Sequence, residues 1–201
     1  MYVFLCISRL TFSYYCYLLQ CRGDKPIGTS FRVCDQMLDD DSCQPQAVLF
    51  GMLGAAASLA FSNIGAAYGT AKAGVAVAHL GIVEPSRVMR GIVPVVMAGI
   101  LGIYGLIVSV IISNNLKTSG YMMFSGFMHF GAGLAAGIAS LASGYAIGIV
   151  GDICCFAYAK TEKIFVPMIL MLIFAEALGL YGLIMALLMN NRATSYKATC
   201  K

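Results

Sequence analysis

The sequence predicts an all-α membrane protein whose four transmembrane helices form two duplicated antiparallel hairpins. Composition points to the membrane, since 60% of the 201 residues are hydrophobic, 11% are charged and the mean hydropathy is +0.83. A soluble domain this apolar could not cover its surface with polar groups. Four long apolar segments and an internal repeat supply the number of helices and their pairing.

Four segments without Lys, Arg or Asp are long enough to cross a bilayer as helices. A helix needs about 20 apolar residues to span about 30 Å of hydrocarbon, whereas barrel strands have about 10 residues of alternating polarity. Short polar connections join consecutive segments, which predicts antiparallel neighbours. The segments run from 47 to 71, 91 to 113, 121 to 151 and 164 to 189.

The predicted organisation has five parts. Residues 1–46 do not fit the hairpin pattern and lack the features of a signal peptide, so they are a retained extension, a fifth span or a mis-called start. The connections inside the hairpins are predicted at 72–90 and 152–163. The other parts are a first hairpin at 47–113, a connecting loop at 114–120, a second hairpin at 121–189 and a polar C-terminal tail at 190–201.

The second hairpin repeats the first. Small residues in its first helix recur 79 residues after their counterparts, and Gly-Ile-Tyr-Gly-Leu-Ile at 102–107 returns as Gly-Leu-Tyr-Gly-Leu-Ile at 179–184. Steps of four and seven place small residues on one helix face, where a neighbouring helix can approach closely. General tight packing explains many glycines but not matched spacings, and a duplication implies stacking or ring closure. The counterparts are Gly54, Ser58, Gly65 and Gly69 in the first hairpin, and Gly133, Gly137, Gly144 and Gly148 in the second.

One formally charged side chain, Glu176, lies inside the four predicted spans. A carboxylate at the bilayer centre costs a few kcal/mol, about 2.5–3.5 on insertion scales, so such a group is usually functional. Desolvation favours its neutral form, and a nearby cation or water would let it release its proton. Glu176 is therefore the predicted proton carrier. Its counterpart in the first hairpin is Gly99, which leaves one acid for two hairpins.

Other functions remain possible from the residues alone. The lone acid would also suit a small proton-coupled exporter of lipophilic cations. In a third alternative, the chain is a pore-forming or structural protein and Glu176 only stabilises the packing of its helices. Ala175, Ala177 and Gly179 leave room for another helix and not for an aromatic cavity, which favours the carrier. Sodium is the rival ion, but the oxygen ligands on offer are few: Tyr104, Ser109, Tyr181, Ser62 and Asn63.

The remaining polar and sulfur-containing residues are predicted to be structural. His129 is expected to be interfacial or packed, and no basic run with interleaved aromatics supports nucleic-acid binding. The eight cysteines contain no CxxC pair, so neither a metal site nor a cofactor is expected. Lys72 and Asp152 are expected at helix ends in the headgroup region, and Pro94 and Pro167 in first helical turns.

Several of these stretches resemble the c-type proteolipids of vacuolar-type proton ATPases. The resemblance covers about residues 48 to 190 and rests on Phe50–Ala56, Gly65–Lys72, Ile92–Ile100, Gly144–Asp152 and Ile173–Glu176. It departs from the family pattern at Ile153–Tyr158, where small residues and an arginine are usual.

The resemblance implies a ring of proteolipid subunits in the bilayer of a vacuolar or other acidic endomembrane compartment. The family's essential glutamate falls on Glu176, which a stator subunit's arginine would meet as the ring turns. ATP hydrolysis and the central stalk would reside on other chains, so this chain would carry ions without being catalytic alone. The 72–90 and 152–163 connections would face the cytosol, and both termini the lumen.

Overall fold

The computed structural model describes residues 45–116, 121 and 123–195. The regular elements of this described part are helices, and none is a strand. Predictions that fall on residues 1–44, including five of the cysteines, and on residues 196–201 lie outside the described residues.

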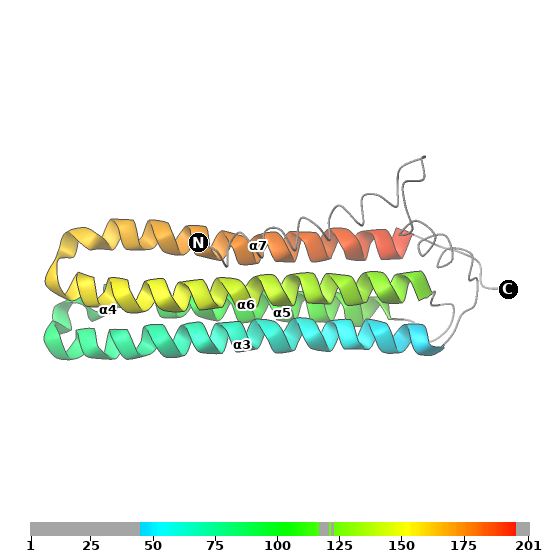
Figure 1. The fold of residues 1–201 in the computed structure, drawn as a ribbon, viewed down its shortest axis with the longest axis horizontal. Coiled ribbons are helices and arrows are strands. Elements are labelled where there is room, and N and C mark those ends of the chain that lie inside the picture. The colour runs from blue at the N-terminus through cyan, green and yellow to red at the C-terminus, as the bar shows by residue number, and fades with distance from the viewer. Residues whose placement is uncertain (1–44, 117–120, 122, 196–201) are drawn as a thin grey trace, which may run out of the picture.

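Four long helices lie side by side in an elongated bundle (Figure 1). Each is long and apolar enough to cross a membrane, which confirms the four-helix prediction and makes the chain a multi-pass membrane protein. The turn between α3 and α5 and the turn between α6 and α7 lie at the same end. The long helices are α3 (Pro45–Val83), α5 (Val93–Asn115), α6 (Met123–Lys160) and α7 (Phe165–Ser195), and the short ones are η1 (Pro85–Arg87), α4 (Val88–Gly91) and η2 (Glu162–Ile164).

The helices extend further than the apolar segments predicted. Helix α3 continues past Lys72 to Val83, and α6 continues past Asp152 to Lys160. The predicted ends of these two helices were wrong because they were placed at the first charged residue, which marks the end of the apolar segment. A helix ends where its backbone hydrogen bonding is interrupted, and that point comes later in both helices. In α3 that interruption is Pro85, which disfavours the helical conformation of the residue before it.

Lys72 and Asp152 do not end their helices, contrary to the expectation. They face each other across α3 and α6, with the ammonium nitrogen 3.9 Å from a carboxylate oxygen. Helix α7 likewise runs into the predicted polar tail as far as Ser195. Asn190 is buried there, so polarity alone did not mark the end of the bundle.

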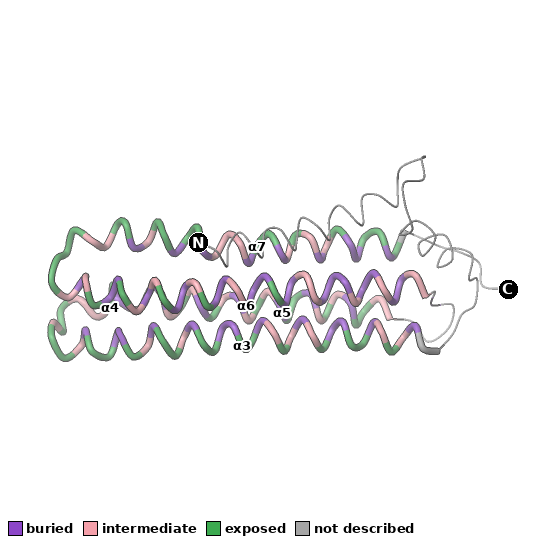
Figure 2. The backbone as a smooth tube through the Cα atoms, viewed as in Figure 1, coloured by how far each residue is buried: buried purple, intermediate pink, exposed green. Residues whose placement is uncertain are grey.

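Helices α3 and α6 pack backbone to backbone at the duplicated glycines. A Cβ at Gly133 would run into the backbone of Gly54, and a Cβ at Gly148 would lie 3.2 Å from the Cα of Gly69. The predicted small-residue grooves therefore face each other. Helix α6 contacts all three other long helices and is the most buried of them (Figure 2).

Aromatic contacts join α3 and α6 along their whole length. Phe50 stacks on Phe127 with ring centroids 4.8 Å apart, and Tyr68 stacks on Tyr145 at 5.1 Å. His79 contacts Phe156 at 4.9 Å. Each pair joins positions 77 residues apart, so α3 and α6 run parallel and in register.

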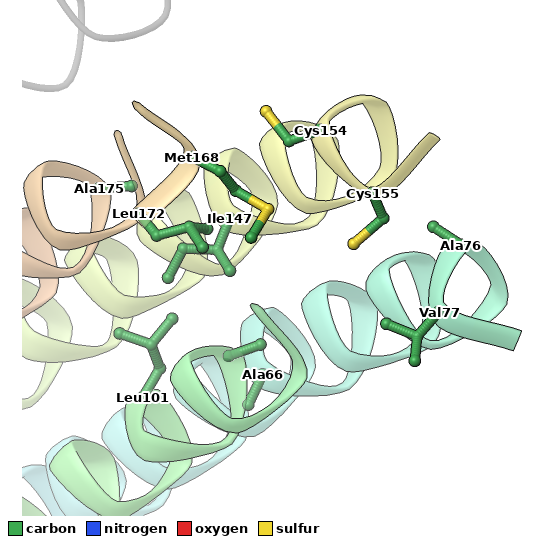
Figure 3. Close-up of a cluster of buried hydrophobic side chains, with 11 residues drawn as sticks. Ala66, Ala76, Val77, Leu101, Ile147, Cys154, Cys155, Met168, Leu172 and Ala175 are labelled. Carbon is green, nitrogen blue, oxygen red and sulfur yellow. The ribbon is translucent and has the colours of Figure 1, made fainter. Parts of the chain in front are cut away.

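A hydrophobic cluster fixes α7 against the other helices. Figure 3 shows Leu101 of α5, Ile147 of α6 and Leu172 of α7 pointing toward a common centre, and all three are fully buried. Ala175 completes the α7 side of the cluster. The residue that follows Ala175 is Glu176, so this packing sets the position of the acid.

Candidate functional site in the membrane

Glu176 lies well inside the membrane-spanning part of α7. It is fourteen residues after Glu162 and eighteen before Thr194, the limits of the candidate span. At 1.5 Å per residue these distances are about 21 and 27 Å, and both exceed half of a hydrocarbon core about 30 Å thick. The carboxyl is half-buried, between the packed face of α7 and its outer face.

The Tyr104 hydroxyl of α5 donates a hydrogen bond to Glu176 Oε1 at 3.2 Å. The two residues are 72 positions apart in the chain, and the bond spans the groove between α5 and α7. A hydroxyl donor holds one carboxyl oxygen in place whether the acid is neutral or ionised. Tyr104 is therefore the described side chain that orients the acid.

The backbone next to Glu176 is held from the opposite side by α6. Ser143 Oγ donates a hydrogen bond to the Ala175 carbonyl at 2.6 Å. One turn further along α7, a Cβ at Gly179 would lie 2.6 Å from Leu101 Cδ2 and 3.4 Å from Ser143 Oγ. This close packing leaves no room for α7 to rotate within the bundle, so Glu176 keeps a fixed direction.

The outer side of the acid is open. Phe174 is 67% exposed and Tyr181 is 60% exposed, so the face of α7 beside Glu176 has no cover from the described part of the chain. Gly99, the counterpart of Glu176 in the first hairpin, is exposed, and no described atom lies within 4 Å of a Cβ added there. The duplicated site therefore has room for a side chain and lacks one.

Within the described residues, positive charge lies far from the acid. The described basic side chains belong to the turn end of the bundle or to the last turn of α7, where Arg192 lies sixteen residues beyond Glu176. Neither of the ion pairs found among the described residues involves Glu176. No group of three or more His, Cys, Asp and Glu residues that could hold a metal ion occurs in the described part of the chain.

The turn end of the bundle is tied together by Arg87. Its guanidinium donates to the Tyr158 carbonyl at 3.3 Å, lies 6.0 Å from the centre of the Tyr158 ring and pairs with Glu162 at 3.3 Å. The Ile153–Tyr158 stretch is helical and packed, not a loop as predicted. Cys155 is fully buried, with Sγ 3.7 Å from the Gly91 carbonyl oxygen.

The opposite end holds a buried polar network around His129. The ring is 1% exposed, which confirms the packed alternative of the sequence prediction. The Tyr121 hydroxyl is hydrogen-bonded to His129 Nδ1, and Asn115 Nδ2 donates to Asn190 Oδ1 at 2.9 Å. Sequence reasoning missed this network because its members come from three different helices and a connection.

Two duplicated hairpins, packed through glycines and carrying one mid-membrane acid, define a duplicated-hairpin membrane proteolipid. The sequence pattern of the ATP synthase C-subunit family matches residues 53–112 and 130–189, once in each hairpin. The chain belongs to this family.

Proteins of similar sequence are proteolipid subunits of V-type proton ATPases. The 16 kDa proteolipid of the V-type proton ATPase of Chrysotila carterae is 54% identical over 157 residues, which cover 76% of this chain and 96% of that protein. The c-type V-ATPase subunit of Candida tropicalis is 50% identical over 160 residues, or 80% of this chain and 99% of that protein. The 16 kDa V-ATPase proteolipid of Rattus norvegicus is 51% identical over 143 residues, or 71% and 92%.

Proposed function

We propose that this chain is a proton-translocating, non-catalytic proteolipid subunit of a V-type proton ATPase, and that it carries H⁺ on Glu176. The observation that carries the proposal is the mid-span acid of α7, oriented by Tyr104 on one side and open on the other. The names of the similar proteins supply the type of complex.

The proposed cycle follows from the energy of a carboxyl group in hydrocarbon. While Glu176 faces lipid it stays protonated, since a charged carboxylate there is costly. When it meets a cation in a water-accessible path on a partner subunit, the charged form becomes favourable and the proton leaves. A stator arginine is the proposed cation, and rotation of a ring of these chains would bring each Glu176 to it in turn.

A proton fits this site better than sodium. A hard metal cation needs several oxygen ligands around it, whereas Glu176 accepts one hydrogen bond from the side chains of the described residues. That donor, Tyr104, belongs to α5, and the neighbours of the acid on α7 are Ala175 and Ala177. The site offers one carboxyl and one hydroxyl, which suffice for a proton.

The proposed setting is the membrane sector of the ATPase in a vacuolar or other acidic endomembrane compartment. Other proteolipid chains would form the ring, and a central stalk would couple it to the chains that hydrolyse ATP. Because Gly99 replaces the acid in the first hairpin, each chain would carry one proton per turn. Fewer protons per ATP permit pumping against a steeper gradient.

The decisive variant is Glu176→Gln, which keeps the shape of the side chain and removes the titrating group. We expect the ATPase to assemble and ATP-driven acidification of vesicles to fall to background. Glu84→Gln is the matched control, because Glu84 lies in the turn between α3 and η1 and bonds Ser86 there; it should pump at the normal rate. Acidification that persisted with Glu176→Gln as the sole proteolipid would refute the carrier role.

A further inference from the structure

The end of the bundle farthest from the Lys72–Asp152 pair contains a buried imidazole held by neutral partners. His129 of α6 is 1% exposed and Tyr121 is 7% exposed, and the Tyr121 hydroxyl is hydrogen-bonded to His129 Nδ1. Asn190 of α7 lies beside the same ring without completing a hydrogen bond of good geometry to Nε2. The imidazole thus joins α6 to the connection that precedes it and lies beside α7.

The network extends to the other two long helices. Asn115 at the end of α5 donates to Asn190 Oδ1 at 2.9 Å. On the α3 side, a Cβ at Gly54 would lie 2.6 Å from the His129 carbonyl oxygen, and a Cβ at Gly51 would lie 2.9 Å from the Tyr121 hydroxyl. All four helices therefore meet at this cluster, which we call the His129 latch: His129, Tyr121, Asn190 and Asn115.

No negative charge in the described residues is near enough to stabilise a protonated His129. The described carboxylates are Glu84, Asp152 and Glu162, which lie at the turn end of the bundle, and Glu176, about 21 Å before Asn190 along α7.

The described groups around His129 and its partners are uncharged or basic. The Tyr121 ring stacks on the His129 ring. On α3, Gly54 lies against the His129 carbonyl and Gly51 against the Tyr121 hydroxyl, and on α5 Asn115 donates to Asn190. Helix α7 presents Asn190, followed two residues later by the exposed Arg192, which has the same sign as an imidazolium. Burial raises the pKa of Tyr121, so its hydroxyl stays neutral and able to donate.

We propose that the His129 latch is acid-sensitive: neutral His129 closes this end of the bundle, and protonation of His129 opens it. An imidazolium is strongly unfavourable in a buried site without a counter-ion, and the described residues provide none, so a proton taken up there favours a conformation in which water reaches the ring. The stability contributed by the latch is present at neutral pH and is lost as the pH falls. The loss begins as the pH falls below about 6.5, where a ring exposed to water in the open conformation takes up a proton.

An acid-sensitive latch would also regulate pumping, and this step rests on the proposed function. In that setting the termini and the α5–α6 connection face the compartment that is being acidified. Opening of the latch in acid would loosen the contacts of α5 and α7 with α6 and slow the turnover of the ring. The acid that the pump produces would then limit further pumping.

Hydrogen–deuterium exchange of the assembled wild-type complex tests the latch directly. After correction for the intrinsic pH dependence of exchange, we expect protection of residues 123–131 to fall at least fivefold between pH 7.5 and pH 5.5. His129→Gln removes the titrating ring and should abolish this response. His79→Gln is the matched control, because His79 is exposed near the turn end of α3, and it should respond as the wild type does.

Two results would overturn the latch. One is an unchanged protection of this segment in the wild type, which needs no variant to be folded. The other is the same acid response in His129→Gln as in the wild type.

Vesicle acidification separates the latch from the carrier role. With His129→Gln the initial rate at neutral pH should match the wild type, and the final internal pH should be lower by several tenths of a unit. An unchanged final pH would reject the regulatory role of the latch while pumping itself continued. Failure of the proposed function looks different, because it would be pumping that survives Glu176→Gln.

Discussion

At the scale of single residues, Tyr104 is the hydrogen-bond donor and Glu176 the acceptor. The hydroxyl has one proton to donate, and it donates it to Oε1 of the acid at 3.2 Å. A neutral carboxylic acid bears its own proton on one oxygen and accepts on the other. Tyr104 therefore leaves the second oxygen of Glu176 free to hold a proton, as the proposed carrier role requires, and fixes the direction in which that oxygen points.

Replacing Tyr104 by Phe should impair the carrier without abolishing it. A hydrogen bond of this kind contributes about 0.5–1.5 kcal/mol, which corresponds to a change of about two- to tenfold in rate or equilibrium. We expect proton pumping to slow by that factor while the complex assembles normally. The measurement is the initial rate of ATP-driven acidification at several values of pH.

The duplication supplies a matched control for that variant. Tyr181 is the counterpart of Tyr104 in the second hairpin and is 60% exposed. Tyr181→Phe removes the same atom from the same helix position without touching the bond to Glu176. Equal effects of the two variants would show that the hydroxyl of Tyr104 acts through something other than the acid.

The sequence was sufficient to single out Glu176 as the candidate carrier, which stays a prediction, and insufficient to identify the side chain that it meets. A lone acid in about a hundred apolar residues is visible without any structure, because its cost does not depend on which helix lies next to it. Tyr104 was one of five residues whose side-chain oxygen could have been placed near the acid. That it meets Glu176 depends on how α5 packs against α7. The His129 latch was missed for the same reason.

At the scale of helices, the contact between α3 and α6 decides whether the bundle closes. A Cβ at Gly133 would collide with the Gly54 backbone, which cannot move aside as a flexible side chain could. Gly133→Ala should therefore force the two helices apart, and overpacking of this kind costs about 1–3 kcal/mol. We expect a lower thermal midpoint for the complex in detergent and reduced assembly.

Gly74→Ala is the control for the glycine interface. Gly74 also lies in α3, but no described atom comes within 4 Å of a Cβ added there. Alanine is favoured over glycine in a helix by about 1 kcal/mol, so this variant should keep or raise the midpoint. A drop of similar size in both variants would mean that the duplicated glycines have no special packing role.

The repeat predicted the helix faces better than it predicted the helix ends. The matched spacing of Gly54 and Gly133 identified the contact between α3 and α6. The ends depend on backbone interruption and pairing, and the Lys72–Asp152 pair lets both helices continue beyond the apolar segments. A charge in the sequence shows where lipid is expected to end, but it does not show where a helix ends.

At the scale of the whole molecule, the bundle is apolar outside as well as inside. Large hydrophobic side chains are exposed along every long helix, among them Ile82, Ile103, Ile153 and Leu170. In α7, 22% of the most hydrophobic stretch is buried within the chain. Such a surface needs lipid or other copies of the chain around it, as a ring in the bilayer would provide.

In a ring, blocking the acid of one chain should stop proton transport by all the chains of that ring. Carbodiimides modify protonated carboxyls in apolar surroundings, so Glu176 should be the labelled residue, and labelling should decline as the pH rises because the ionised form does not react. On the proposed mechanism, a modified chain could no longer release a proton to the stator, and the ring could not turn past it. Pumping should therefore stop when one chain in each ring is labelled.

The measurement compares the labelled fraction of chains, by mass spectrometry, with the remaining rate of acidification. Native mass spectrometry of the same preparation gives the number of copies in the assembly. For a ring, labelling at random should make the rate fall as the unlabelled fraction raised to the power of that number, because a single labelled chain stops its whole ring. If the chains worked as independent carriers, the rate would be proportional to the unlabelled fraction. A stable monomer in mild detergent would also contradict the prediction, because one labelled chain could then not block others.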